Sequence, residues 1–292
     1  MNTNEIPHIT FKKDLSLSVE VINFEELYNK LKASEDHNPF DVHKIDFYLI
    51  LVVTKNSYRH FLDFNFYELY EGSALFISKN QIQRFSETIK VSKGYGIIFN
   101  SDFLNQHYFL SDKLRLNRLF NYHIESPLIH QKELGENEFL DITKKLYEEY
   151  GSTNSLGKSE ILGSLLNVLL LKAERAKTYR NDIKVSQYWL DVFRQFKELL
   201  EEKYTLTRSS KEYASALNIS YKFLNDVVKK LTGKTTKSFI DTYITIEIKR
   251  FLVTTPLSIK EISHSVGFDE PGNMIKFFKK NTGTTPFKFR QL

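Results

Sequence analysis

A stretch of 13 residues near the C-terminus of this chain recurs in related form 50 positions later. The first copy, Val227–Phe239, reads VVKKLTGKTTKSF, and the second, Phe277–Phe289, reads FFKKNTGTTPFKF. Upstream, Lys211-Glu212 and Lys260-Glu261 echo each other at an offset of 49, so one extra residue lies between the two echoes. A supersecondary unit that recurs at such a period indicates one small architecture built twice.

Each copy reads as two short helices joined by a turn. In the second copy, Ser258 is a plausible helix N-cap with Glu261 completing a capping box, and Gly267 can adopt the left-handed conformation of a sharp turn. A second helix begins near Pro271, and a long helix over residues 240–253 joins the copies. The residues predicted to face inward are Ile259, Ile262, Val266, Met274, Phe277 and Phe278 in the second copy, and Tyr213, Leu217, Ile219, Leu224, Val227 and Val228 in the first.

The surplus of positive over negative charge lies in the same region as the repeat. The net charge is +5, but residues from 181 onward hold 19 Lys and Arg against 12 Asp and Glu. Residues 1–180 hold 22 against 24, a net of −2. A solvated lysine face is the alternative explanation for a few surplus charges. Together with the repeat, the asymmetry favours a polyanionic partner.

Two helix-turn-helix units with basic second helices indicate DNA binding. The N-terminal part of the second helix enters the major groove, where Asn can pair with adenine, Lys with guanine, and Asp can accept from cytosine. The residues expected at bases are Tyr221, Lys222, Asn225, Asp226, Asn273, Ile275 and Lys276. The residues expected at phosphates are Ser220, Lys229, Lys234, Thr235, Lys279, Lys280, Thr284 and Arg290.

The C-terminal run IKEISHSVGFDEPGNMIKFFKKNTGTTPFKFR, Ile259–Arg290, contains a Val-Gly-Phe junction, an F-F-K-K core and a closing G-x-T-P-x-x-aromatic-R. With these motifs it resembles the AraC/XylS family of bacterial transcription regulators. The first unit matches more loosely. The resemblance implies double-stranded promoter DNA and RNA polymerase as partners, and the apolar stripe of residues 158–179 would suit a homodimer.

Two positions depart from the pattern of the family. Asp226 stands where the family often has arginine, which puts a guanine contact there in doubt and suits cytosine or no base contact. Met274 stands where an aromatic residue or leucine is common, which is only a core substitution.

The N-terminal part of the chain has the rhythm of short strands and then of helices. Residues 47–54 (FYLILVVT) read as a buried strand, and further strands are expected near 58–66, 74–77 and 95–99. Residues 136–150 and 158–179 read as a helical hairpin, either as core or as a dimer seam. The expected fold class is α+β, with an antiparallel barrel or sandwich over residues 1–130, the hairpin over 131–180 and the DNA-binding domain over 187–292.

The strand region looks like the cupin-type sensor barrel of many family members. Metal-binding cupins need several barrel histidines, but the matching places here offer His43 and then Gln81 and Gln83, so no metal and no cofactor are expected. The residues that could line an effector pocket are His43, Phe47, Tyr48, Tyr58, Phe61 and Tyr67. The alternative is that these side chains simply fill a closed core.

The composition excludes several function classes. The chain has no cysteine, so disulfides, thiolate zinc sites and cysteine nucleophiles are excluded. It shows no signal sequence and no stretch that could span a membrane, so a cytoplasmic location is expected. No catalytic grouping is recognised. We expect a non-enzymatic transcription regulator modulated by a small molecule; a ligand-independent regulator controlled by its abundance or by a protein partner is the alternative. A cupin enzyme fused to a DNA-binding module is a third hypothesis, which the missing histidines oppose.

Overall fold

The computed structural model describes residues 8–10, 17–34, 38–107, 119–120, 126–134, 137–153, 156–178 and 186–291. The chain divides after residue 182 into an N-terminal and a C-terminal unit. The N-terminal unit comprises residues 7–182, so from residue 7 onward the predicted segments 1–130 and 131–180 fall together in it. Within the described ranges, no helix has the length and apolar character needed to cross a membrane.

The N-terminal unit contains two sheets of five strands each. One sheet holds, in order, β1 (His8–Ile9), β3 (His43–Ile45), β8 (Ile82–Arg84), β5 (Tyr58–Leu62) and β6 (Asn65–Leu69). The other holds β10 (Leu128–Ile129), β7 (Ala74–Ile77), β4 (Tyr48–Lys55), β9 (Lys93–Phe99) and β2 (Val19–Asn23). Among the described strands, all pairings are antiparallel except that of β1 with β3, which is parallel. The strands thus form two separate sheets and not one closed barrel.

Strand β4 explains why residues 47–54 are continuously apolar. Leu49, Leu51 and Val53 belong to the hydrophobic cluster that includes Tyr58, Leu62 and Leu69 of the other sheet. Ile50 and Val52, on the opposite face of the strand, belong to a second cluster that includes residues of the helices. Successive side chains of a strand point to opposite faces, so this central strand is buried on both sides.

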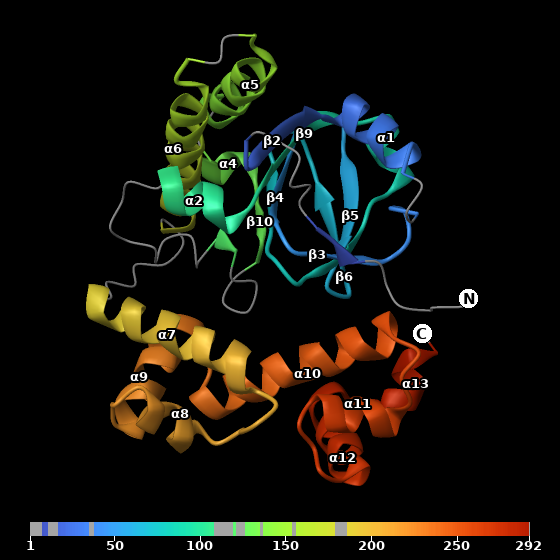
Figure 1. Ribbon diagram of the computed structural model, residues 1–292, viewed down its shortest axis with the longest axis vertical. Helices are drawn as coiled ribbons and strands as arrows, with labels where there is room; N and C mark the ends of the chain where they lie inside the picture. The colour runs from blue at the N-terminus through green and yellow to red at the C-terminus, as the bar shows by residue number, and fades with distance from the viewer. Residues whose placement is uncertain are drawn as a thin grey trace. The chain divides into compact units, whose positions relative to one another are not determined.

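The helical segments that the structure describes in the N-terminal unit are α1 (Phe24–Lys32), η1 (Glu87–Lys90), α2 (Ser101–His107), α4 (Gln131–Leu134), α5 (Glu138–Gly151) and α6 (Lys158–Thr178). Helices α5 and α6 form the predicted hairpin, beside the sheet that contains β4 (Figure 1). One flank of α6 is buried, with Leu162, Leu166 and Leu169 in the core. The other flank exposes Ile161 and Val168, at 42% and 43% of their surface.

The described residues of the C-terminal unit form helices joined by short loops. Its helices are α7 (Gln187–Lys203), α8 (Ser210–Ala216), α9 (Tyr221–Thr232), α10 (Thr236–Thr254), α11 (Ile259–Ser265), α12 (Pro271–Thr282) and α13 (Pro286–Arg290). The α+β fold class and the long joining helix are confirmed, although α10 begins four residues before the predicted start.

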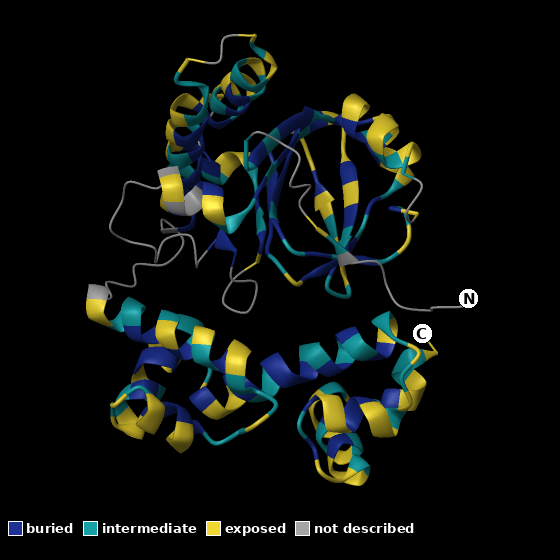
Figure 2. Cartoon of the chain, in the orientation of Figure 1, coloured by how far each residue is buried: buried dark blue, intermediate teal, exposed yellow. Residues whose placement is uncertain are grey.

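Helix α10 is the shared core of the two helix-turn-helix units. It packs against α8 and α9 at its N-terminal part and against α11, α12 and α13 further along. Its buried residues, dark blue along the helix in Figure 2, include Phe239, Ile244 and Ile248. Phe239 contacts Phe193 and Phe196 of α7, with ring centroids 5.5 and 5.8 Å apart.

Candidate nucleic-acid interface

The second helices of both repeats end in the same way. Gly233 and Gly283 have φ angles of 71° and 77°, and their N–H groups donate to the carbonyls of Lys229 and Lys279 at 2.9 Å. A glycine in this left-handed conformation is a common helix C-cap. The Thr-Gly pair of the repeat is therefore a helix terminator used twice.

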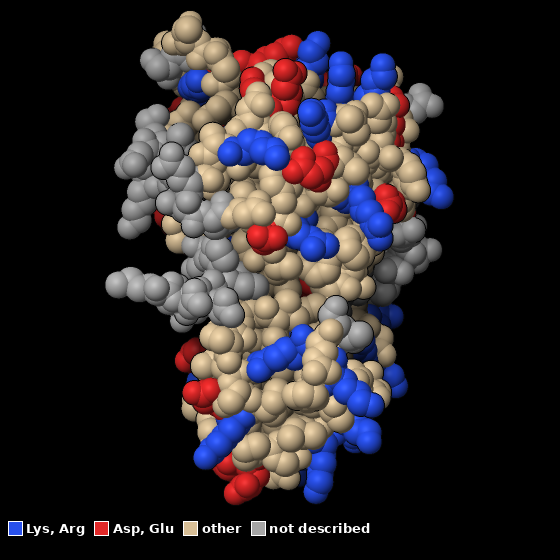
Figure 3. Space-filling view, turned by 90° about the vertical axis from the view of Figure 1, so that its right-hand side faces the viewer, with Lys and Arg blue, Asp and Glu red and all other residues tan. Residues whose placement is uncertain are grey.

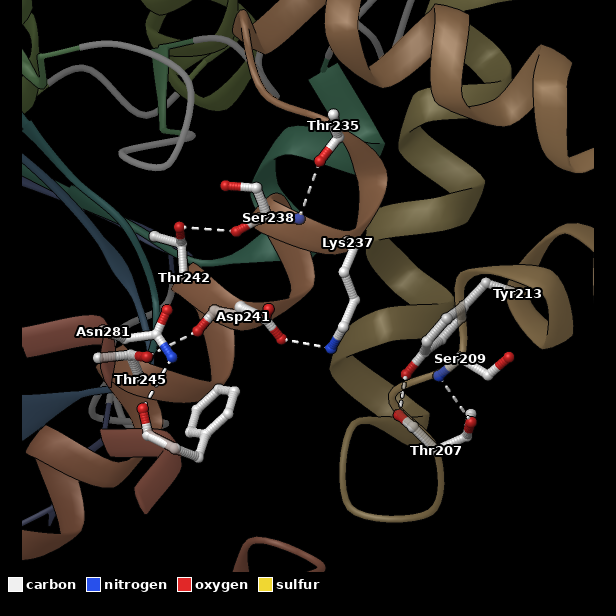
Figure 4. Close-up of polar contacts among 11 residues, drawn as sticks. Thr207, Ser209, Tyr213, Thr235, Lys237, Ser238, Asp241, Thr242, Thr245 and Asn281 are labelled. Carbon is white, nitrogen blue, oxygen red and sulfur yellow. Dashed lines mark hydrogen bonds and ion pairs between the residues drawn. The ribbon is translucent and has the colours of Figure 1, made fainter. Parts of the chain in front are cut away.

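The threonines that follow each glycine start the next helix. Thr235 caps α10 by accepting from the N–H of Ser238 at 3.2 Å (Figure 4), and Thr285 caps α13 by accepting from the N–H of Lys288 at 3.3 Å. Side-chain oxygens at the N-cap satisfy backbone donors that the helix itself leaves unpaired. The repeated sequence thus encodes one helix end, one tight connection and one helix start.

The extra residue of the second copy lies in its turn. Asn218 and Gly267, 49 positions apart, both have positive φ angles, of 54° and 77°. The next residues, Ile219 and Phe268, donate to the carbonyls of Ala214 and Ser263 at 3.0 and 2.9 Å. Because α9 begins at position 221 and α12 at position 271, the offset changes from 49 to 50 immediately after this hydrogen bond.

The second helices expose polar residues on one face and bury apolar residues on the other. Exposed on α9 are Tyr221, Lys222, Asp226, Lys229 and Lys230, and exposed on α12 are Asn273, Lys276, Lys279 and Lys280. Buried are Leu224, Val227 and Val228 of α9 and Met274 and Phe278 of α12, as predicted. On the side of the C-terminal unit that Figure 3 draws, Lys and Arg project over much of the surface while Asp and Glu gather at an edge.

Asn225, predicted to contact a base, is instead a capping residue within the domain. Its side-chain oxygen accepts from the backbone N–H of Thr236, at 3.1 Å, and the residue is half-buried. The equivalent pair in the second copy is Ile275 and Pro286. Since Pro286 has no N–H group, no acceptor is needed there, and an apolar residue replaces the asparagine. The side-chain oxygen of Asn225 is therefore engaged within the domain.

Arg290, predicted to contact phosphate, closes the end of α10. Its Nε donates to the carbonyl of Leu252 at 3.2 Å, and its side chain is half-buried. The last carbonyls of a helix lack partners within the helix, so a cation there satisfies both a hydrogen bond and the helix dipole. Lys234 is also engaged internally, since its Nζ lies 3.4 Å from the hydroxyl of Thr242.

The remaining predicted phosphate contacts lie at helix ends or on exposed helix faces. Ser220 caps α9 by accepting from the N–H of Phe223 at 3.1 Å. Thr284 donates its N–H to the hydroxyl of Thr282 at 3.3 Å and is half-buried. Lys229, Lys279 and Lys280 are exposed.

An aromatic cluster at the start of α9 was missed in the sequence. Phe223, which corresponds to the exposed Asn273, stacks on Tyr188 of α7 at 5.6 Å and meets Trp189 edge-on at 5.6 Å. At this position the first unit therefore presents a shielded aromatic ring where the second presents an amide. The signal was the adjacent pair Tyr188-Trp189 at the start of an amphipathic helix.

A hydrogen-bonded group of polar residues lies buried in the N-terminal unit. The hydroxyl of Tyr58 lies 3.0 Å from Nδ1 of His60, and Nε2 of His60 lies 3.0 Å from Oε1 of Gln83. Because Oε1 only accepts, Nε2 of His60 is the donor in this hydrogen bond. The pKa of His60 is lowered to about 3, chiefly by burial. The hydrogen bond to Gln83 raises this pKa, and the nearby His43 contributes to lowering it. Burial also raises the pKa of Tyr58.

The predicted effector-pocket residues do not all face the interior between the sheets. Four of them face this interior. Phe47 and Tyr58 belong to the hydrophobic cluster between the sheets, Tyr67 packs against it, and His43 stacks on Phe85 of the cluster. Tyr48 instead packs on Phe99 and Phe120, in the cluster shared with the helices, because it has the opposite parity along β4. Phe61 lies on the outer face of β5, where it meets the half-exposed Phe66.

A second histidine lies between the two sheets. His60, not singled out in the sequence, joins His43 there, with Phe85 packed against both rings. Among the residues that the structure describes, no three His, Cys, Asp or Glu side chains are grouped so as to hold a metal ion. The donors present are those of a neutral hydrogen-bonding network.

Residues 213–292 match a family model described as a helix-turn-helix domain. The C-terminal unit contains an AraC-type helix-turn-helix domain. The match begins at Tyr213 in α8, so α7 precedes it, although α7 contributes Phe193 and Phe196 to the core of the domain.

Curated relatives resemble the chain in this region. The Msm operon regulatory protein of Streptococcus mutans is 34% identical over 100 residues, which cover 33% of this chain and 35% of that protein. The bifunctional transcriptional activator/DNA repair enzyme AdaA of Bacillus subtilis is 27% identical over 104 residues, or 36% of this chain and 48% of that protein. The alignments thus span between a third and a half of these relatives.

Among solved structures, ToxT from Vibrio cholerae is similar to the chain with a TM-score of 0.46 and 16% sequence identity. The alignment covers 94% of this chain and 97% of ToxT. Within the AraC-type domain, the geometry described above assigns the exposed faces of α9 and α12 as the candidate interface.

Proposed function

We propose that this protein is a sequence-specific, DNA-binding transcription regulator without enzymatic activity. The observation that carries the proposal is the pair of equivalent basic helices, α9 and α12, held by one continuous helix, α10. Two such helices on a common scaffold can enter successive turns of the major groove, about 34 Å apart. The names of the relatives, an operon regulatory protein and a transcriptional activator, support the same function.

The exposed residues of the two helices divide into base-reading and phosphate-binding groups. We assign Tyr221, Lys222 and Asp226 of the first unit, and Asn273 and Lys276 of the second, to bases. Lys229, Lys279 and Lys280, a turn further along, are assigned to phosphates together with the helix start at Ser220 and Thr235. Ile275, half-buried, is retained only for apolar contact with a thymine methyl group.

The proposed partners are promoter DNA, RNA polymerase and a second copy of the chain. A dimer seam on α6 is supported by its exposed Ile161 and Val168, which lie seven residues apart on one flank. A cytoplasmic location belongs to the same proposal.

Modulation by a small molecule in the N-terminal unit is the finer part of this proposal. Polar atoms that could recognise a ligand converge there, on His43, His60 and Gln83. The rings of Phe24, Tyr58, His60, Phe85 and His43 follow one another at centroid distances of 5.5–5.8 Å. This continuous aromatic packing supports the second candidate function, a ligand-independent regulator controlled by its abundance or by a protein partner.

Titration of the full chain against DNA tests the proposed function. The probes are the DNA upstream of its own gene, a pool of random duplexes and the sites selected from that pool, each at two salt concentrations. We expect at least one selected sequence to bind about 10³-fold more tightly than random DNA, with affinity falling as salt rises. Equal affinity for all duplexes, or no binding, would contradict the proposal.

A further inference from the structure

The loop between α7 and α8 in the first helix-turn-helix unit reaches the turn of the second unit. Arg208 of this loop donates from Nη2 to the carbonyl oxygen of Gly267, at 3.1 Å. Its guanidinium group also lies 3.7 Å from the ring centroid of Phe268. Arginine combines these two contacts well, because its planar group stacks on a ring while its edge donates.

The backbone of the same loop lies directly against the turn. A Cβ atom built on Gly267 would stand 1.8 Å from the carbonyl oxygen of Thr205 and 2.5 Å from its carbonyl carbon. The φ angle of Gly267, 77°, independently disfavours a side chain. Glycine is thus required here both by the turn and by the close approach of Thr205, which belongs to the other half of the domain.

The loop is also tied to its own unit. The hydroxyl of Tyr213 in α8 donates to the carbonyl of Thr207 at 3.0 Å, and the N–H of Ser209 donates to the hydroxyl of Thr207 at 3.0 Å (Figure 4). Tyr204, at the start of the loop, packs edge-on against Tyr243 of α10 with ring centroids 5.4 Å apart. The loop therefore carries a continuous set of contacts from α8 to the turn before α12.

This contact is not a feature of the repeat. The residues equivalent to Gly267 and Phe268 in the first unit are Asn218 and Ile219, and Asn218 is exposed. The loop of the first unit therefore contacts the turn of the second unit, and the turn of the first unit has no equivalent residues for such a contact. These contacts connect the two units in addition to α10. Two separate connections restrict the angle between the units more than one helix does.

We propose that Arg208 is a positioning residue that holds α9 and α12 at one relative angle, so that the domain accepts one spacing of DNA half-sites. The part that concerns half-site spacing rests on the proposed function, whereas the part that concerns the angle between α9 and α12 does not. Two helices held at the right angle bind two half-sites without losing further conformational entropy. Two helices whose angle varies should bind the best half-site spacing more weakly, but should discriminate less against other spacings.

The first experiment measures the angle without DNA. The chain has no cysteine, so Lys230→Cys with Lys280→Cys gives two spin labels, one on each exposed helix, in the full chain. We expect a narrow distance distribution for the parent and a broad or shifted one for Arg208→Ala, Arg208→Lys and Phe268→Leu. Arg194→Ala is the matched control, because it removes the same charge from α7, where Arg194 pairs with Glu198. Identical distributions in parent and Arg208 variants would overturn the inference.

The second experiment measures spacing on DNA, using a selected bipartite site and versions with one base pair added or removed. One base pair shifts a half-site by about 3.4 Å and rotates it by about 34°. The parent should lose about tenfold or more in affinity with each change, and Arg208→Ala should lose several-fold at the original spacing but little more elsewhere. A uniform loss at every spacing would mean that Arg208 contributes only charge or stability. If the parent binds no DNA, the proposed function fails, and the spin-label distances still decide the role of Arg208.

Discussion

Asp226 of α9 and Lys276 of α12 occupy equivalent positions of the two repeats, 50 residues apart, and both are exposed. One is an acceptor with negative charge and the other a donor with positive charge. Lys suits the acceptor atoms of guanine, whereas Asp accepts from cytosine and is repelled by phosphate. The two units therefore present different chemistry on the same scaffold, and the DNA site should be asymmetric.

Replacement of Lys276 by alanine should weaken binding to a selected site by about 1–3 kcal/mol and relax preference at one base pair. The exposed side chain makes no contribution to the core, so the melting temperature should not change. Anisotropy titration with a set of single-base variants measures both effects. Lys144→Ala, which removes an exposed lysine from α5, is the control and should leave binding as in the parent. Unchanged affinity and unchanged preference in Lys276→Ala would refute its role as a base reader.

Replacement of Asp226 by asparagine removes the charge but keeps the size of the side chain. We expect weaker discrimination at one base pair, by about 1–3 kcal/mol, and an unchanged slope of affinity against salt. The same titration set is suitable. A gain in affinity for every sequence alike would show instead that Asp226 only repels phosphate.

Asn225 and Asn273 make a matched pair, because one is engaged within the domain and the other is exposed. Asn225→Ala removes the acceptor of the Thr236 N–H and should lower the free energy of unfolding by about 1–3 kcal/mol, with base preference unchanged. Asn273→Ala should change the base preference and leave the free energy of unfolding unchanged. Urea unfolding and site selection on both variants separate the roles. A change of base preference in Asn225→Ala at unchanged stability would restore it to the interface.

The stability of the N-terminal unit should fall as the pH is lowered, because of His60. Burial holds its pKa at about 3, whereas in the unfolded chain it has the ordinary value near 6.5. Between these values only the unfolded state binds the proton, so stability is complete above about pH 6.5 and declines below it. At pH 5 the loss from this residue is about 2 kcal/mol.

Urea unfolding of parent and His60→Gln at pH 7 and pH 5 tests this expectation. The variant should be less stable at pH 7 but should lose less than the parent on acidification. His264→Gln, a change of an exposed histidine, should follow the parent. Equal pH dependence in parent and His60→Gln would show that His60 does not remain neutral on folding.

Local patterns predicted much of the helical domain. The capping box of Ser258 and Glu261, the positive φ angle of Gly267 and the inward register of Met274 and Phe278 all follow from residues within a few positions of each other. Such features depend on backbone geometry that a short sequence determines. Helix α1 carried the same kind of signal, since Asn23 and Glu26 form a capping box, but it was not recognised.

The sequence did not reveal contacts between residues that are far apart in the chain. Asn225 and Arg290 have the chemistry of DNA contacts, but Thr236 and Leu252, brought close by the packing of α10, engage them. Tyr48 and Phe61 are aromatic residues of the kind that line pockets, but neither faces the space between the sheets. Which face of a strand points to that space depends on where the second sheet packs. Arg208 was not noticed because its partners, Gly267 and Phe268, are about 60 residues away in sequence.

Footprinting of the full chain on a selected duplex tests most directly that the two units bind DNA as a pair. The account predicts two protected major-groove segments on one face of the duplex, about 34 Å apart, with Lys276→Ala weakening one of them and Asp226→Asn altering the other. A single protected segment, or protection that does not depend on sequence, would contradict it.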